Sequence, residues 1–243
     1  MPNRKSAGYP PEVLKAMLRV NYNEEAAGYD KERYTERAID VRFSKMVRHL
    51  LPKWTVGTRV LELAAGTGYW GEYMRSLGLR YGGIEITDSM VQVARAKELY
   101  VRQGDVESTD LYPLEVDTVF CIKAFGFFTN LSKVLENVRG CLRFGGRFIN
   151  FYYNDRYHNA VVRLYSIFKD PDNIAYQPPW DVRHTWKEYR QLSKTAGLKV
   201  IYMRDCVVLP FRIIPKELRP LASKIDDKLT HFGFITMAVS EKE

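Results

Sequence analysis

The sequence predicts an α/β fold built on a doubly wound, mostly parallel sheet of seven strands. Short apolar runs alternate with segments whose apolar residues recur every three or four positions, which is the pattern of strands and amphipathic helices in alternation. A glycine-rich turn follows the first of these strands and opens a helix. The 243 residues suffice for one domain with a large core, and 46% hydrophobic and 27% charged residues exclude a fibrous or wholly disordered chain.

The order of the elements follows from the same patterns. The predicted strands cover residues 59–64, 80–86, 100–103, 116–123, 147–153, 199–209 and 232–239. The predicted helices cover residues 12–20, 30–51, 70–77, 88–99, 130–142, 155–168, 185–196 and 215–229. We expect Pro52 to end the second helix, Asp88 to cap the fourth, and Gly145-Gly146 to open the fifth strand. Residues 170–181 contain three prolines and predict a loop.

The positive charge lies outside the middle of the chain. The net charge is +8, of which residues 1–58 and 151–243 each contribute +4, and residues 59–150 are neutral. A basic chain indicates a nucleic acid, an anionic membrane or an anionic ligand as partner, or a solvated basic face without one. No run of five like charges occurs, so the charge pattern disfavours binding to a nucleic-acid backbone.

Neither the cysteines nor the N-terminus indicates an oxidising compartment. The three cysteines, Cys121, Cys141 and Cys206, form no pair at metal or disulfide spacing, so no metal site is expected. The polar start of the chain predicts no signal peptide, and the longest apolar stretch is too short to span a bilayer. We therefore expect a cytoplasmic protein.

The glycine-rich turn admits two interpretations. Gly66-Thr-Gly68-Tyr-Trp-Gly71 fits G-x-G-x-x-G, and Glu85 ends the next strand where an acid binds ribose, as in NAD(P)-dependent oxidoreductases. Three features favour another nucleoside cofactor. Glu62 lies inside the first strand, bulky Trp70 lies where the helix would pack closely, and Asp105 follows the third strand.

Five segments in order resemble the class I S-adenosylmethionine (SAM) dependent methyltransferases. They are residues 62–68, 83–87, 104–106, 117–123 and 142–149, with Ala64 in place of the first glycine of the commonest first motif. The resemblance implies a Rossmann-like, doubly wound seven-stranded sheet, mostly parallel with the last strand antiparallel. It also implies one methyltransferase domain over residues 1–243, with an N-terminal helical cover (1–58), a SAM-binding core (59–150) and a substrate side with the C-terminal strands (151–243).

The resemblance further implies a role for each motif residue toward S-adenosyl-L-methionine. Glu85 is expected to accept both ribose hydroxyls, Asp105 the adenine amino group, and Glu62 to attract the cofactor's ammonium group. The remaining cofactor contacts are assigned to the turn at Ala64, Gly66 and Gly68, to Ile86, Met90 and Val106 around adenine, to the main chain at Cys121 and Ile122, and to Tyr29 or Tyr34 closing from the N-terminal region.

The implied activity is methyl transfer to an O, N or C atom of a small, hydrophobic or aromatic acceptor. Aromatic residues gather in 125–128, in 151–153 and at Trp180, near the expected pocket. The candidates for a catalytic base are His184, Lys123 and Tyr153, with His158 as a further one. An RNA-directed methyltransferase and an NAD(P)-dependent oxidoreductase stay open as alternatives, as do a homodimer and contact of residues 210–221 with an anionic membrane.

Overall fold

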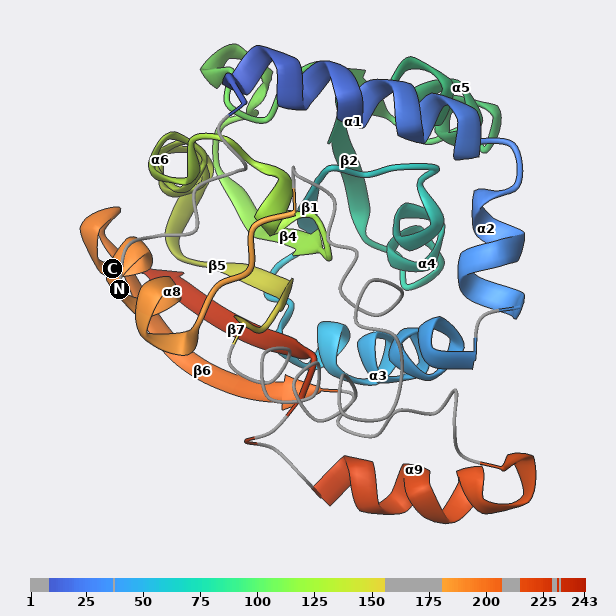
Figure 1. Ribbon diagram of the computed structural model, residues 1–243. Coiled ribbons are helices and arrows are strands. Elements are labelled where there is room, and N and C mark those ends of the chain that lie inside the picture. Colours follow the sequence, from blue (N-terminus) through green and yellow to red (C-terminus); the bar gives the residue numbers. More distant parts are fainter. Residues whose placement is uncertain (1–8, 37, 156–180, 207–214, 229–230, 232) are drawn as a thin grey trace.

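The centre of the molecule is a seven-stranded sheet with the strand order β3-β2-β1-β4-β5-β7-β6 (Figure 1). The computed structural model describes residues 9–36, 38–155, 181–206, 215–228, 231 and 233–243. Neighbouring strands from β3 to β5 pair in parallel, whereas β7 is antiparallel to both β5 and β6, which confirms the predicted sheet. The strands are β1 (Arg59–Leu63), β2 (Arg80–Glu85), β3 (Val101–Gln103), β4 (Val116–Ile122), β5 (Leu142–Tyr153), β6 (Leu198–Cys206) and β7 (Ile235–Lys242).

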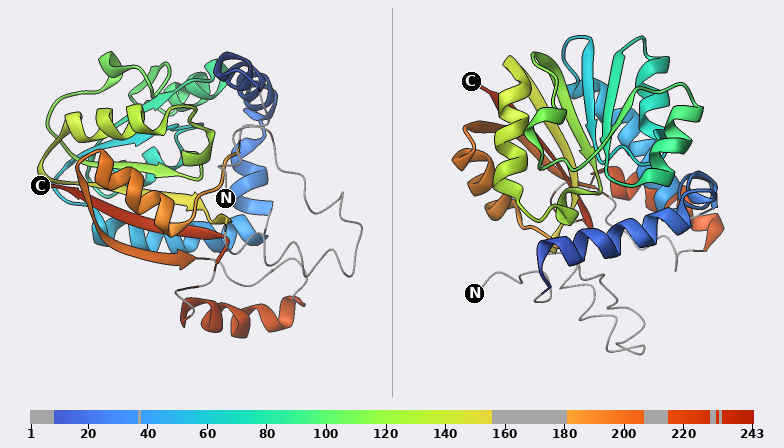
Figure 2. Two further views of the ribbon diagram at one scale, coloured as in Figure 1. Left: turned by 60° about the vertical axis from the view of Figure 1, so that its left-hand side comes forward. Right: turned by 90° about the horizontal axis from the view of Figure 1, so that it is seen from above.

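Helices cover both faces of this sheet, and α1 crosses in front of one end of it (Figure 2). In Figures 1 and 2, α9 lies apart from the sheet layers. The α-helices are α1 (Pro11–Glu25), α2 (Tyr29–Lys31), α3 (Ala38–Trp54), α4 (Tyr69–Ser76), α5 (Asp88–Ala96), α6 (Leu131–Cys141), α8 (Trp186–Thr195) and α9 (Arg219–Lys228). Within the described residues, no helix is both long and apolar enough to cross a membrane.

Side chains that alternate along the strands build a separate core on each face. On β4, Val119 and Cys121 pack with α6 and α8, whereas Phe120 between them packs with α3 and α4. The same alternation separates Phe148 from Ile149 on β5. All five side chains are fully buried, as expected for central strands of a doubly wound sheet.

The N-terminal helical region differs from the prediction in three ways. The first helix, expected over residues 12–20, runs from Pro11 to Glu25. The helix expected over residues 30–51 is divided into α2, a π-helical turn (Glu32–Glu36) and α3. Pro52 was expected to end α3, but the helix continues to Trp54. A proline lacks the N–H that would bond to the carbonyl four residues earlier, and the Tyr73 hydroxyl donates to that carbonyl, Arg48 O, at 2.8 Å instead.

Other predicted boundaries shift by a few residues. Thr87, rather than Asp88, is the residue that precedes α5, and Asp88 is its first residue. β5 begins at Leu142, directly after α6, because the chain enters the sheet before the two glycines. The predicted helix over 155–168 and the loop over 170–181 lie almost entirely outside the described residues, as do His158 and Trp180.

Candidate functional site

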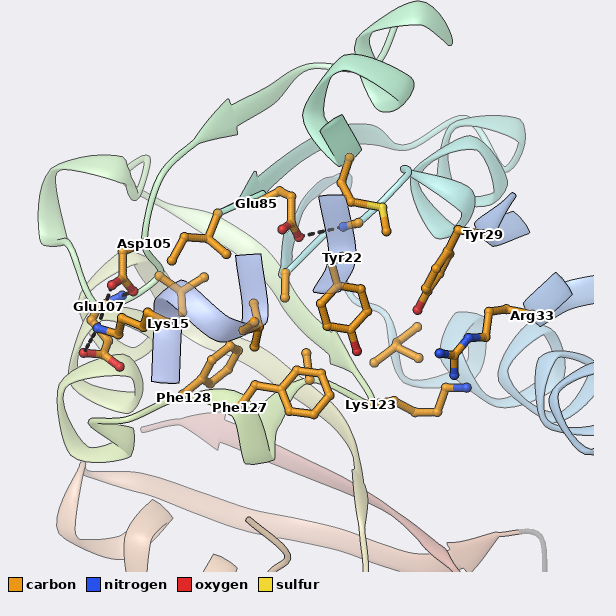
Figure 3. A pocket seen from close by; sticks show the side chains of 18 of the residues that line it. Lys15, Tyr22, Tyr29, Arg33, Glu85, Asp105, Glu107, Lys123, Phe127 and Phe128 are labelled. Carbon is orange, nitrogen blue, oxygen red and sulfur yellow. Dashed lines mark hydrogen bonds and ion pairs between the residues drawn. The ribbon is translucent and has the colours of Figure 1, made fainter. Parts of the chain in front are cut away.

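A pocket lies where the carboxyl ends of the parallel strands face α1 (Figure 3). In a doubly wound sheet, ligands bind at this edge because the loops that follow the strands meet there. It contains about 870 Å³ of space free of protein atoms, part of which is open solvent. The lining residues used below come from α1, from the N-terminal segment after it, and from the ends of β1, β2, β3, β4 and β5.

The turn after β1 brings backbone close to this pocket. Ala64, Gly66 and Gly68 all have left-handed backbone angles, with φ of 54°, 54° and 75°. A Cβ built on Gly66 would meet no atom within 4 Å, whereas one on Gly68 would meet the side chain of Leu99. Gly66 therefore leaves room for a ligand, and Gly68 leaves room for packing at the start of α4.

Glu85 ties this turn to the end of β2. Its carboxylate is 5% exposed, and it accepts the Gly66 N–H at 2.9 Å on Oε2 and the Thr87 N–H at 2.8 Å on Oε1. Burial raises the pKa of the Glu85 carboxyl, and the backbone hydrogen bonds offset part of that effect. Because each carboxylate oxygen can accept two hydrogen bonds, Glu85 can take two further donors from a ligand.

A second acidic group lies after β3, at the other end of the pocket. Lys15 Nζ on α1 is 2.7 Å from Asp105 Oδ2 and 2.7 Å from Glu107 Oε2 (Figure 3). Burial opposes ionisation of Glu107, but hydrogen bonds from Lys15 and Thr129 outweigh it and lower the pKa of its carboxyl. The ion pairs fasten α1 to the loop after β3.

Three tyrosines converge at the opposite end. Tyr22 comes from α1, Tyr29 from α2 and Tyr153 from the end of β5, and all three line the pocket. The rings of Tyr22 and Tyr29 are 6.1 Å apart, and Phe127 lies 6.0 Å from Tyr22. Burial raises the pKa of each of the three phenols, so their hydroxyls stay protonated near neutral pH.

Two cationic side chains join these tyrosines, as Figure 3 shows for Arg33 and Lys123. The Arg33 guanidinium lies 5.3 Å from the centre of the Tyr29 ring and pairs with Glu25 at 3.1 Å. Its Nε is buried without a hydrogen-bond partner. Lys123 has a left-handed backbone (φ 60°), and its Nζ is 2.6 Å from Asp40 Oδ1.

Most of the residues singled out from the sequence come together here. Those that line the pocket are Tyr29, Ala64, Gly66, Glu85, Ile86, Met90, Asp105, Val106, Ile122, Lys123 and Tyr153. Five do not line it. Gly68 begins α4 behind the turn, and Cys121 is fully buried in the core, one residue before Ile122. Tyr34 stacks on Tyr69 with ring centres 3.6 Å apart.

Glu62 and His184 also lie away from the pocket lining. Glu62 is 2% exposed, its Oε2 accepts the Tyr81 hydroxyl at 2.7 Å, and burial raises the pKa of its carboxyl. His184 is 8% exposed with its ring centre 5.6 Å from that of Phe125, and burial lowers the pKa of its imidazole. Neither side chain is therefore assigned a contact with a ligand in this pocket.

The contributions of α1 and Arg33 were not predicted from the sequence. Lys15, Leu18 and Tyr22 lie on one face of α1 at three- and four-residue spacing, but the predicted helix ended at residue 20 and left Tyr22 outside it. Glu107 follows the third motif by one residue and lines the same pocket. A lysine and a tyrosine at helical spacing from Leu18 were the available signal.

Comparisons with known proteins agree with this geometry. Residues 61–150 match the methyltransferase domain family. A dTDP-4-amino-2,3,4,6-tetradeoxy-D-glucose N,N-dimethyltransferase of Saccharopolyspora spinosa is 32% identical over 107 residues, 42% of this chain and 42% of that protein. A malonyl-[acyl-carrier protein] O-methyltransferase of Methylococcus capsulatus is 26% identical over 140 residues, 55% of this chain and 50% of that protein. The chain thus spans half or less of these relatives' length.

A solved structure extends the likeness to nearly the whole chain. Magnesium protoporphyrin IX methyltransferase of Synechocystis, crystallised with S-adenosylhomocysteine (SAH), superposes with a TM-score of 0.66 at 14% identity and covers 94% of this chain and 100% of that one. At this identity the likeness shows the fold.

The pocket also suits the cofactor of these proteins. The buried Glu85 carboxylate has capacity for two hydroxyl donors, and the apolar side chains of Ile86 and Met90 border the same space. The open side of Gly66 lets a ligand approach the backbone. Within the described residues, no cluster of His, Cys, Asp or Glu is arranged to hold a metal ion. Residues 61–150 therefore match the methyltransferase domain family, and the chain resembles the class I S-adenosylmethionine-dependent methyltransferases in fold.

Proposed function

We propose that the protein transfers a methyl group from S-adenosylmethionine to a small acceptor. The observation that carries this proposal is the meeting of the Gly66 turn, Glu85 and Asp105 in one pocket at three strand ends. When bound, the cofactor supplies an activated methyl group on a sulfonium. The protein has to bind it, align the acceptor and keep out water.

The proposed roles follow the position of each side chain. Glu85 accepts the ribose hydroxyls with its free lone pairs, and Asp105 faces the adenine amino group next to Lys15. Ile86 and Met90 flank the adenine ring. The turn at Ala64 and Gly66 and the main chain at Ile122 border the methionine portion, with Tyr29 over it. Four residues have indirect roles outside the pocket. The turn and the strand ends that border the methionine portion are supported from behind by the packing of Gly68, Glu62 and Cys121, and α2 is supported by Tyr34.

The acceptor is expected beyond the methionine portion, against an apolar wall. Leu18 and Phe127 line this side together with Tyr22 and Tyr153, and Leu18 packs with Tyr22 and Phe127. Such a surface favours a small hydrophobic or aromatic molecule over a strongly hydrated one. Of the candidate catalytic residues, Lys123 and Tyr153 lie at the pocket, and we retain them as the groups nearest the acceptor.

The alternative functions have less support. The dinucleotide fold has the strand order 3-2-1-4-5-6 without an inserted antiparallel strand, whereas here β7 lies between β5 and β6. RNA methylation, membrane contact, a homodimer and the cytoplasmic location stay predictions. The exposed Leu218, Leu221 and Ile225 on and beside α9 are the residues on which a membrane or dimer contact would depend.

Calorimetric titration with SAH tests the proposal. The wild-type chain is expected to bind SAH at micromolar concentration and not to bind NADH. Glu85→Gln replaces one acceptor oxygen by an amide donor and weakens a charge-assisted contact, so SAH affinity falls about tenfold or more. Glu136→Gln, on the exposed side of α6, is the matched control and leaves affinity unchanged. Binding of NADH in place of SAH would overturn the proposal.

A further inference from the structure

In the part of the chain that the structure describes, the residues lining the tyrosine-rich end of the pocket supply hydrogen-bond donors and cations but no free base. Figure 3 shows Tyr22, Tyr29, Arg33 and Lys123 directed toward the same space, which Tyr153 also lines. Among the described lining residues, the carboxylates are Glu85, Asp105 and Glu107. Each of them is held by hydrogen bonds or ion pairs at the other strand ends.

None of the five groups at this end can take a proton from an acceptor. Burial keeps the three phenols protonated by raising their pKa. The Lys123 ammonium is held by Asp40, and a guanidinium carries its charge at any physiological pH. Among the described residues that line this end, an acceptor that needs deprotonation, such as an alcohol or a protonated amine, therefore finds no base.

The two cations also exceed what the cofactor requires. S-adenosylmethionine brings one carboxylate, and either Arg33 or Lys123 can hold it. Both side chains keep donor capacity after their contacts with Glu25 and Asp40, because guanidinium has five N–H donors and ammonium has three. One cation is then available to the acceptor: the buried Nε of Arg33 has no hydrogen-bond partner, and the Lys123 ammonium can donate N–H groups other than the one directed at Asp40.

We propose that the acceptor is a carboxylate, and that this end of the pocket, formed by Tyr22, Tyr29, Arg33, Lys123 and Tyr153, is a carboxylate-binding subsite for it. The proposal rests on the methyltransferase function. It assigns the substrate class: a small acid with an apolar or aromatic body against Leu18 and Phe127.

The reaction balances without a proton transfer. A carboxylate oxygen attacks the methyl carbon in line with the carbon–sulfur bond. The oxygen–carbon bond forms as the carbon–sulfur bond breaks and leaves its electron pair on sulfur. The negative charge of the acid and the positive charge of the sulfonium cancel, so the products are a neutral methyl ester and SAH. The ester no longer carries the charge that the cations bind, which favours its release.

The chemical stability of the transferred methyl group tests this assignment. The full chain is incubated with SAM labelled in the methyl group and with octanoate, phenylacetate or benzoate. Octan-1-ol, octylamine and octanamide serve as matched controls, and a small-molecule extract of the expression host is a further acceptor source. We expect label from the acids or the extract in a product that mild alkali releases as methanol, as methyl esters do. Label stable to alkali, or transferred to the alcohol or amine, overturns the substrate class.

Two variants separate the cofactor's carboxylate from that of the acceptor. If Arg33 holds the cofactor, Arg33→Gln raises the Kd for SAH about tenfold, and Lys123→Gln leaves that Kd unchanged but raises KM for the acid about tenfold or more. The proposal also holds if the roles are reversed, so that Lys123→Gln raises the Kd for SAH and Arg33→Gln raises KM for the acid. If both variants weaken SAH binding and neither changes KM, both cations serve the cofactor and the subsite is refuted.

Control variants guard against a folding artefact. Because Lys123→Gln leaves Asp40 buried without its partner, the double variant Asp40→Asn/Lys123→Gln is measured beside it, and Lys194→Gln on the exposed side of α8 is the neutral control. SAH binding without transfer to any acid or to the extract contradicts the substrate class alone. Absence of SAH binding contradicts the methyltransferase function itself.

Discussion

Gly66 and Gly68 lie two residues apart in one turn, and alanine at each is expected to damage a different property. Both have positive φ, so alanine at either position costs about 1–2 kcal/mol of backbone strain. A Cβ on Gly66 enters open pocket space, whereas one on Gly68 is forced against Leu99, which is 5% exposed, and lies 3.2 Å from Ala94 Cβ. Overpacking of this kind adds about 1–3 kcal/mol.

The two variants should therefore separate stability from binding. Gly68→Ala is expected to lower the free energy of unfolding by about 2–5 kcal/mol, and Gly66→Ala by only about 1–2 kcal/mol. Gly66→Ala should weaken SAH binding at least tenfold (about 1.4 kcal/mol or more), because its methyl group occupies ligand space. Urea denaturation and calorimetric titration measure the two quantities. Equal losses of stability, or unchanged SAH affinity in Gly66→Ala, would refute this account of the turn.

Three further predictions test other parts of the structure. Ala64→Gly relieves left-handed backbone strain and should raise the free energy of unfolding by up to about 1 kcal/mol, whereas the control Ala16→Gly, on the exposed side of α1, should lower it by about 1 kcal/mol. A loss for both variants in urea denaturation would contradict the strain at Ala64. Burial raises the pKa of the Glu62 carboxyl, so the free energy of unfolding of the wild type falls as the pH rises through that pKa. A glutamine side chain does not ionise, so the free energy of unfolding of Glu62→Gln should rise relative to that of the wild type between pH 5 and pH 8. A difference that stays constant with pH in urea unfolding would contradict this. Lys15→Met removes two partly exposed ion pairs worth about 1 kcal/mol together, so SAH should dissociate about fivefold faster in stopped-flow measurements. An unchanged dissociation rate would show that α1 does not retain the ligand.

The sequence predicted what depends on local pattern. The strands, the turn at Gly66 and the acids Glu85 and Asp105 were found because parallel strands deliver the residues after their carboxyl ends to one edge of the sheet. Ala64 stands where the methyltransferases that this sequence resembles most often have glycine, but its left-handed backbone was not predicted.

Side-chain direction and contacts between distant segments were harder to predict. Successive strand residues face opposite sides, so Cys121 enters the core while Ile122, after it, reaches the pocket. Helical spacing predicted an apolar stripe over residues 12–20, but it did not show that this helix extends to Glu25 or that it covers the strand ends. Lys15 and Tyr22 were therefore not predicted to line the pocket. The second helix was predicted to stop at Pro52 because nothing in the sequence shows that Tyr73 satisfies the carbonyl left free.

Hydrogen–deuterium exchange with and without SAH tests most directly whether the strand-end pocket is the cofactor site. We expect slower amide exchange on SAH addition in the segments around Gly66, around Glu85 and around Asp105, and in α1, which covers them. We expect no change in β6 or α8, which lie away from the pocket. Protection confined to β6 and α8, or no protection at SAH concentrations well above the measured Kd, would show that the cofactor does not bind in this pocket.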